Sequence, residues 1–197
     1  MKIITAYDKN LEWMANNLIK SAKGHKVKAY ELGKDFEVAE NDFVDFIKKC
    51  TFKPLLIKKV LGNTREPFAW IDVDCLIVGK LDIKFNFDLG VTMRRKSERD
   101  QDEYSDYSGW INAGVIFINN TLRAKRLVEE WIEEIPNTKT GTDQEALSNL
   151  VRRRPEIKAF TTDEYNFFYF PEEPGNAKIL HFKGDTRPYY NEYLTKI

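Results

Sequence analysis

Residues 68–78 read Phe-Ala-Trp-Ile-Asp-Val-Asp-Cys-Leu-Ile-Val. The first four side chains are apolar and rich in aromatic and β-branched types, which favours a buried strand. Asp72 and Asp74 follow directly, one residue apart, where that strand ends. Open α/β sheets bind ligands at the carboxyl ends of their strands. This stretch therefore predicts a sheet and also the edge of that sheet where a site lies.

The chain on both sides of this stretch alternates strands with helices. It opens with an apolar strand over residues 3–7, a helix with apolar side chains at helical spacing over residues 11–22, and a second strand over residues 27–30. A strand, a helix and a strand in this order are typical of a parallel sheet with crossover helices. We predict an α/β fold in which a mostly parallel central sheet has helices on both faces.

The remaining elements follow from the same patterns and from Pro, Gly and capping residues. We expect a helix over residues 42–61 that is interrupted at Pro54. The other predicted elements are strands at residues 89–93, 114–118, 157–160 and 179–182, and helices at residues 122–135 and from Thr142 to about residue 151. No composition shift marks a boundary, so residues 1–197 are expected to form a single compact domain.

Residues 94–108 differ from the rest of the chain because they carry almost nothing apolar to bury. This composition predicts a mobile surface loop. Such a loop can close over a ligand as a lid or contact an acceptor, and Tyr104, Tyr107 and Trp110 offer faces on which sugars stack. The alternative interpretation is a solvated surface loop without a function.

Composition excludes several classes of protein. The 31 basic and 31 acidic residues give zero net charge, which argues against a protein that coats nucleic acid. Two cysteines cannot form a zinc cluster or a disulfide scaffold, so Cys50 and Cys75 are expected to be small buried apolar residues, with a reactive thiol as the alternative. No run reaches the ~18 apolar residues of a membrane span, and the first eight residues do not resemble a signal peptide. The expected compartment is the cytoplasm.

Two carboxylates one residue apart at a strand end are costly unless a cation compensates them. Hard divalent ions with oxygen ligands, Mg²⁺ or Mn²⁺, commonly do so and can neutralise a departing diphosphate. The alternative is a chance Asp-X-Asp in a turn. Polar groups at other predicted element ends favour a site, namely Asp8, Asn112, Asp143, Gln144 and His181. Each also has a structural alternative, such as a turn residue, a helix cap or a core histidine.

Four segments and one lysine of this sequence resemble motifs of a known family, and they follow one another in the same order as in that family. Residues 70–78 resemble the DxD element of GT-A nucleotide-sugar glycosyltransferases, and Ile-Asn-Ala-Gly-Val-Ile-Phe-Ile-Asn at residues 111–119 resembles the NAGV strand of the family 8-like glycogenin and galactosyltransferase group. Thr-Asp-Gln-Glu-Ala-Leu at residues 142–147 resembles their DQ helix start, and Ile-Leu-His-Phe-Lys-Gly at residues 179–184 their HF.G element. Lys53 resembles the lysine ahead of the DxD strand.

The resemblance covers residues 3 to about 188 and implies a GT-A hexosyltransferase. It would move a sugar from a nucleotide diphosphate donor, expected to be UDP-linked, to a hydroxyl of a glycan or other acceptor, with Mn²⁺ or Mg²⁺ as cofactor. The implied metal ligands are Asp72, Asp74 and His181, and the implied catalytic residues are Asp143 and Gln144. The implied substrate contacts are Thr5, Ala6 and Asp8 for the nucleotide, Lys53 and Asp72 for the donor, Lys183, Gly184 and Arg187 for the diphosphate, and Asn112 and Ala113 for the sugar or acceptor.

The sequence departs from the family at one motif and leaves the stereochemistry open. Arg187 and Tyr189 stand where the family has lysine and tryptophan, although arginine also pairs with phosphate. An inverting enzyme would use Asp143 as the base, whereas a retaining one, towards which the resemblance leans, would hold Gln144 near the anomeric carbon. Two other hypotheses remain. One is a haloacid dehalogenase-like phosphatase with Asp72 as nucleophile, and the other is a non-catalytic module that binds a nucleotide or glycan.

Overall fold

The computed structural model describes residues 1–36, 42–94, 109–169 and 174–195, without the side chains of residues 42–50 and 185. The loop that we predict over residues 94–108 therefore lies outside the described residues, apart from Arg94. The same holds for the side chain of Cys50, whereas Cys75 is fully buried, as predicted.

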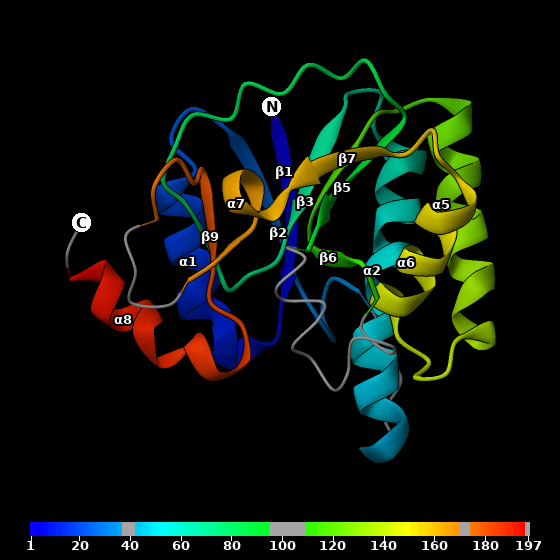
Figure 1. The fold of residues 1–197 in the computed structure, drawn as a ribbon. Helices are drawn as coiled ribbons and strands as arrows, with labels where there is room; N and C mark the ends of the chain where they lie inside the picture. Colours follow the sequence, from blue (N-terminus) through cyan, green and yellow to red (C-terminus); the bar gives the residue numbers. More distant parts are fainter. Residues whose placement is uncertain (37–41, 95–108, 170–173, 196–197) are drawn as a thin grey trace.

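A six-stranded sheet forms the centre of the molecule (Figure 1). Its order is β2 (Lys26–Glu31), β1 (Lys2–Tyr7), β3 (Phe68–Ile71), β6 (Ile111–Ile118), β5 (Leu89–Met93) and β7 (Lys158–Thr161). β6 runs antiparallel to both of its neighbours, and the other three neighbouring pairs are parallel. The predicted α/β class and mostly parallel sheet are confirmed. The predicted strand over residues 114–118 begins earlier, at Ile111, so Asn112 lies inside a strand rather than beside one.

A second, three-stranded sheet has the order β4 (Cys75–Ile77), β9 (Ile179–His181), β8 (Phe167–Phe168). β4 follows β3 after a tight turn, and it pairs antiparallel with β9 so that Cys75 faces His181. Sequence patterns did not predict this sheet as a separate unit. Its effect is to bring the end of the chain to the residues that directly follow β3.

Helices cover both faces of the central sheet, as predicted (Figure 1). One face packs on α2 (Asp42–Asn63), α5 (Leu122–Glu134) and α6 (Asp143–Arg153), and the other lies towards α1 (Glu12–Ser21), with α8 (Pro188–Leu194) beyond it. The remaining short elements are α7 (Thr162–Tyr165) and the 3₁₀ turns η1 (Lys9–Leu11), η2 (Ile135–Asn137) and η3 (Gly184–Thr186).

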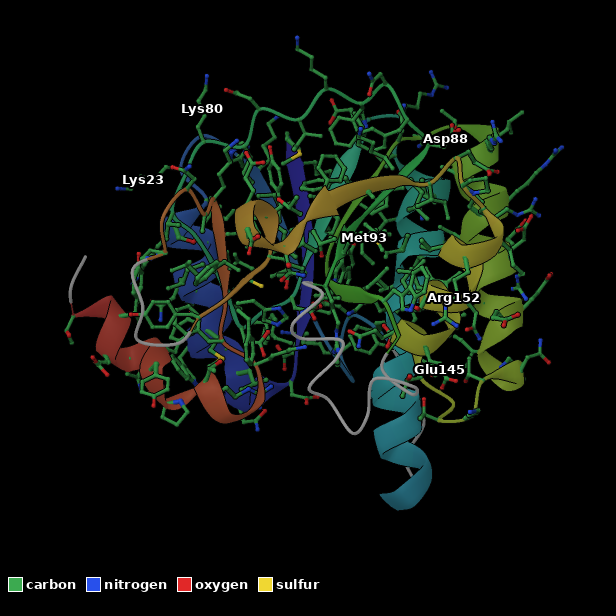
Figure 2. The ribbon with its side chains drawn as sticks, in the orientation of Figure 1. Lys23, Lys80, Asp88, Met93, Glu145 and Arg152 are labelled. Atoms are coloured by element: carbon green, nitrogen blue, oxygen red, sulfur yellow. The ribbon has the colours of Figure 1, made fainter. Side chains whose placement is uncertain are left out.

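Side chains along β3 alternate between the two faces, as a pleated strand requires. Phe68 and Trp70 belong to the core beneath α2, α5 and α6, whereas Ala69 and Ile71 pack on the side of α1. Charged side chains such as Lys23 and Lys80 instead extend away from the ribbon (Figure 2). Among the described residues, no helix combines the length and the apolar character that crossing a membrane requires.

The predicted interruption at Pro54 is wrong, because α2 continues through it from Asp42 to Asn63. A proline inside a helix removes one backbone hydrogen bond and costs about 3 kcal/mol. Here the apolar face that follows it, with Leu56, Ile57 and Val60, is almost completely buried against the sheet. Burial of three such side chains contributes more than the proline costs.

A tryptophan in α5 connects the helical layer to the start of α6. Trp131 is fully buried, and its Nε1 donates a hydrogen bond to the carbonyl oxygen of Asp143 at 2.6 Å. We expect Trp131→Phe to lower the free energy of unfolding by about 1–3 kcal/mol, because it removes buried volume and leaves that carbonyl without its donor. Urea titration measures the change. Trp13→Phe is the matched control on an exposed surface, and equal losses for both variants would contradict this role.

Candidate active site

The alternation of β3 determines where Asp72 lies. Asp72 follows on the face of Trp70, towards α2, and the indole Nε1 of Trp70 donates to its Oδ1 at 2.6 Å. Lys53 stands on the buried face of α2, one turn before Leu56 and Ile57, and is only 8% exposed. Its Nζ lies 3.1 Å from Asp72 Oδ1. A buried lysine on a helix and a carboxylate at a strand end therefore compensate each other's charge.

Lys53 also binds two further groups. Its Nζ lies 3.5 Å from Oδ2 of Asp143, the first residue of α6, and donates to the carbonyl oxygen of Ala113 at 2.9 Å. Burial by itself would lower the pKa of Lys53, but Asp72 and Asp143 together raise it above its ordinary value. Burial raises the pKa of Asp143, and the charge of Lys53 partly opposes that shift. One ammonium group is thus shared by two carboxylates, the buried Asp143 and the partly exposed Asp72.

Asp74 has a different set of partners, which come from the end of the chain. Nε2 of His181 lies 3.2 Å from Oδ1 of Asp74, and Nη2 of Arg187 lies 3.2 Å from Oδ2. Burial alone would raise the pKa of Asp74, but His181 and Arg187 hold it lowered to about 2. Asp74 and His181 are more than a hundred residues apart in sequence, and the antiparallel pairing of β4 with β9 brings them together.

An irregularity in β6 supplies backbone groups to the same place. Val91 pairs with Ile116, but the next residue, Thr92, pairs with Asn112 instead of Val115, a shift of three positions. Backbone groups that leave a ladder need other partners. Here side chains provide them: Lys53 donates to the Ala113 carbonyl, Gln144 Oε1 accepts from Ala113 N at 3.2 Å, and Asn112 Oδ1 accepts from Gly114 N at 2.9 Å.

A cavity of about 310 Å³ opens between these groups. Of the predicted site residues, those that line it are Ala6, Asp8, Lys53, Asp72, Asp74, Asp143 and Arg187. Tyr7, Leu11, Leu32, Phe52, Trp70 and Val73 complete its wall. The volume lies at the lower end of the range for small-molecule sites. The lining combines apolar and aromatic walls with four carboxylates and two basic side chains, which suits a ligand with a flat ring and an anionic part that binds together with a cation.

The other predicted residues lie outside the cavity lining. Thr5 is fully buried in β1, and Asn112 and Ala113 are buried in β6 behind the cavity. Gln144 contacts β6 through Ala113, and His181 lies behind Asp74. Lys183 places its Nζ over the ring of Phe168, 5.4 Å from the centroid, and Gly184 is exposed with a φ of +56°.

The donor set around Asp74 fits a divalent cation. Asp74, Cys75 and His181 offer ligand atoms that all lie within 4.8 Å of one another. Burial, and then the charge of Asp74, raise the pKa of the Cys75 thiol well above its ordinary value, so it remains an apolar core group. Two ligands of an octahedral ion with bonds of about 2.1 Å lie about 3.0 Å apart, which matches the 3.2 Å between Asp74 Oδ1 and His181 Nε2. Asp72 is directed to Lys53 and does not belong to this cluster.

Three residues that surround the ring of His181 are not predicted by the sequence. Gly114 lies against the ring of His181, Asn166 binds the ring at 2.8 Å, and Thr92 binds Asn166. Asn166 is fully buried, and in sequence it lies between two aromatic residues. A lone amide in such an apolar run is the sequence feature that indicates a buried polar residue with a specific hydrogen-bond partner.

Comparison with known proteins gives a consistent result. Residues 3–190 match the family described as nucleotide-diphospho-sugar transferase. A search of curated protein sequences gave no match. The match favours the glycosyltransferase hypothesis over the phosphatase and the non-catalytic module.

Solved structures share the fold at low sequence identity. A glycosyltransferase involved in glycosylation of the major capsid of PBCV-1 is 16% identical, with a TM-score of 0.68 over 97% of this chain and 98% of its own. The galactosyltransferase LgtC, solved with donor and acceptor sugar analogs, is 16% identical, with a TM-score of 0.63 over 100% and 94%. GlyE of Streptococcus pneumoniae TIGR4 is 16% identical, with a TM-score of 0.59 over 99% and 63%. The fold is therefore GT-A, as predicted.

Removal of the central ammonium tests the charge network. We expect Lys53→Met to lower the free energy of unfolding by about 3–5 kcal/mol, because it leaves Asp72 and Asp143 without their shared cation. Lys58→Met is the control, since its exposed ion pair with Glu129 contributes at most ~1 kcal/mol. Urea titration of both variants gives the comparison. A loss for Lys53→Met no larger than that for Lys58→Met would contradict the network.

The lowered pKa of Asp74 predicts a particular acid dependence. A carboxylate with a folded-state value of about 2 and an ordinary value of 3.8 stabilises the fold above pH 3.8, and this stabilisation disappears as the pH falls towards 2. We expect the difference in unfolding free energy between the wild type and Asp74→Asn to shrink by about 2 kcal/mol between pH 5 and pH 2. Urea titrations across that range measure it, and a constant difference would contradict the ion pairing.

Proposed function

Because the chain belongs to the nucleotide-diphospho-sugar transferase family, we propose that it moves a sugar from a UDP-linked donor to a hydroxyl of an acceptor glycan, with Mn²⁺ or Mg²⁺ bound at Asp74 and His181. One observation carries the metal and donor parts of this proposal. Asp74 lines the cavity, and the imidazole of His181 lies directly behind it, with its Nε2 3.2 Å from Asp74 Oδ1. The expected roles of the residues follow from this arrangement.

The metal would be held by Asp74 and His181, and Asp72 lies two residues before Asp74, directly after β3. When bound, the ion supplies positive charge that stabilises the leaving diphosphate. Arg187 is suited to the same anion, because its side chain is half-exposed at the cavity and ends 3.2 Å from Asp74. Its guanidinium can form two parallel hydrogen bonds with a phosphate, which the lysine of the family pattern cannot.

The nucleotide would bind at the opposite end of the cavity. Ala6, Tyr7 and Asp8 follow one another along the end of β1, and Leu11 and Leu32 form apolar walls beside them. Apolar walls suit the faces of a base, and a carboxylate such as Asp8 can accept hydrogen bonds from a base N–H or a ribose hydroxyl. The base is therefore proposed to lie at the end of β1 and the diphosphate at the end of β3.

Asp143 and Gln144 are proposed to contact the transferred sugar. Oδ2 of Asp143 is paired with Lys53 at 3.5 Å, and Gln144 is anchored on the backbone of Ala113. A carboxylate held by a buried ammonium is better suited to accept hydrogen bonds from sugar hydroxyls than to remove a proton from an acceptor. This supports a retaining reaction, in which Asp143 positions the sugar and Gln144 lies near the reacting carbon.

A thermal-shift panel of nucleotides and nucleotide sugars, with and without Mn²⁺, tests this function. At a donor concentration a hundredfold above its dissociation constant, we expect UDP or a UDP-sugar to raise the melting temperature by roughly 5–10 °C, and only with the metal present. Asp74→Asn and His181→Ala should abolish the metal-dependent part of the shift, because each removes a ligand. Asp82→Asn, an exposed acid outside the site, is the control.

Turnover of the same panel completes the test. Metal-dependent release of UDP from one donor sugar supports the proposed transferase. A shift that does not depend on Mn²⁺, or one that Asp74→Asn leaves unchanged, would contradict the proposed metal site.

A further inference from the structure

The ring of His181 is fixed between two elements that the catalytic description does not use. The side chain is 2% exposed, and it lies so close to β6 that a Cβ on Gly114 would be 2.4 Å from its Cε1. Only a glycine leaves room for the ring there. One ring nitrogen, Nε2, faces Asp74, and the other, Nδ1, lies 2.8 Å from Oδ1 of Asn166.

The orientation of the Asn166 amide follows from a backbone carbonyl that can only accept hydrogen bonds. The carbonyl oxygen of Asn112 accepts from the Thr92 hydroxyl at 2.8 Å. The single hydroxyl proton of Thr92 is then used, so its oxygen must accept from Nδ2 of Asn166, 2.7 Å away. Nδ2 also donates to the Asn112 carbonyl at 3.2 Å. The amide oxygen of Asn166 must therefore face His181.

This chain of hydrogen bonds determines which nitrogen of His181 carries a proton. Because Oδ1 of Asn166 accepts, Nδ1 of His181 must donate. In a neutral ring the lone pair then belongs to Nε2, the atom that faces Asp74. A histidine that ligates a metal commonly has its other ring N–H bound in this way, which fixes both the tautomer and the ring plane.

We propose that Asn166, held by Thr92 and the Asn112 carbonyl, is a positioning residue that presents Nε2 of His181 to the metal. The proposal rests on the metal site proposed above. It extends that site because Asn166 and Thr92 are fully buried and do not line the cavity, so they act on the ion only through His181. The shift in the pairing of β5 and β6 makes this possible, since it places Asn112 opposite Thr92, whose hydroxyl donates to the Asn112 carbonyl.

Mn²⁺ binding to the full chain, followed by electron paramagnetic resonance of the free ion, tests the proposal with three variants. Asn166→Leu removes the acceptor and should weaken Mn²⁺ binding about 10- to 100-fold. Thr92→Val removes only the group that orients the amide, and it should weaken binding less but in the same direction. Thr162→Val is the matched control, because Thr162 is buried in α7, the helix just before Asn166, and its hydroxyl has no hydrogen-bond partner among the described residues.

A second measurement reports on His181 directly and needs no metal. The chain has two histidines, so ¹⁵N-histidine labelling gives few ring signals, and His25→Gln assigns them. In the metal-free wild type we expect a solvent-protected Nδ1–H signal from His181, because this N–H donates to the buried Oδ1 of Asn166. Asn166→Leu should remove this protection, and Thr162→Val should keep it.

The outcomes separate the two proposals. If the wild type binds Mn²⁺ and both Asn166→Leu and Thr92→Val bind it equally well, the role of Asn166 is wrong and the metal site stands. If Asn166→Leu does not fold, Thr92→Val decides by the same criterion. If the wild type binds no Mn²⁺, the metal site is wrong, and a protected Nδ1–H that persists in Asn166→Leu would overturn the hydrogen-bond chain as well.

Discussion

Asp72, which is partly exposed, and Asp74, which is buried, place two carboxylates at the end of one buried strand, and charge compensation for this pair organises the site around them. Lys53 on α2 forms an ion pair with Asp72, and His181 and Arg187, from the last part of the chain, contact Asp74. A single residue separates the two acids in sequence, yet their partners come from opposite sides of the sheet. The helix α2, which continues through Pro54, and the small sheet built on β9 are the elements that bring Lys53 and His181 into place.

The break in pairing between β5 and β6 joins these two halves. It withdraws residues 113–115 of β6 from the ladder with β5, and their backbone groups, with the Asn112 carbonyl, then accept or donate to side chains from several elements. Lys53, the partner of Asp72, donates to the carbonyl oxygen of Ala113, and Asn166, which contacts Asp74 only through His181, donates to that of Asn112. An irregular strand at the centre of the sheet thus gives a binding site fixed backbone anchors, which loops alone do not provide.

Much of the fold follows from local pattern, whereas the site depends on contacts that pattern does not encode. The periodicity of residues 3–30 is strong enough to predict β1, α1 and β2, and the apolar run before Asp72 predicts β3. The continuity of α2 through Pro54 was missed because burial of its apolar face outweighs the local cost of proline. β8 has two residues and α7 has four, too few for a period to show. Asn166 matters through a carbonyl 54 residues away, and only the three-dimensional structure brings the two together.

The central claim is that a divalent ion binds between Asp74 and His181, with the diphosphate of the donor beside Arg187. The most direct test is a crystal structure of the protein with Mn²⁺ and UDP, analysed by anomalous scattering at the manganese edge. The account predicts one strong anomalous peak about 2.0–2.3 Å from both Asp74 Oδ1 and His181 Nε2. A peak at another place, or UDP bound in the cavity with no ion on these two atoms, would contradict it.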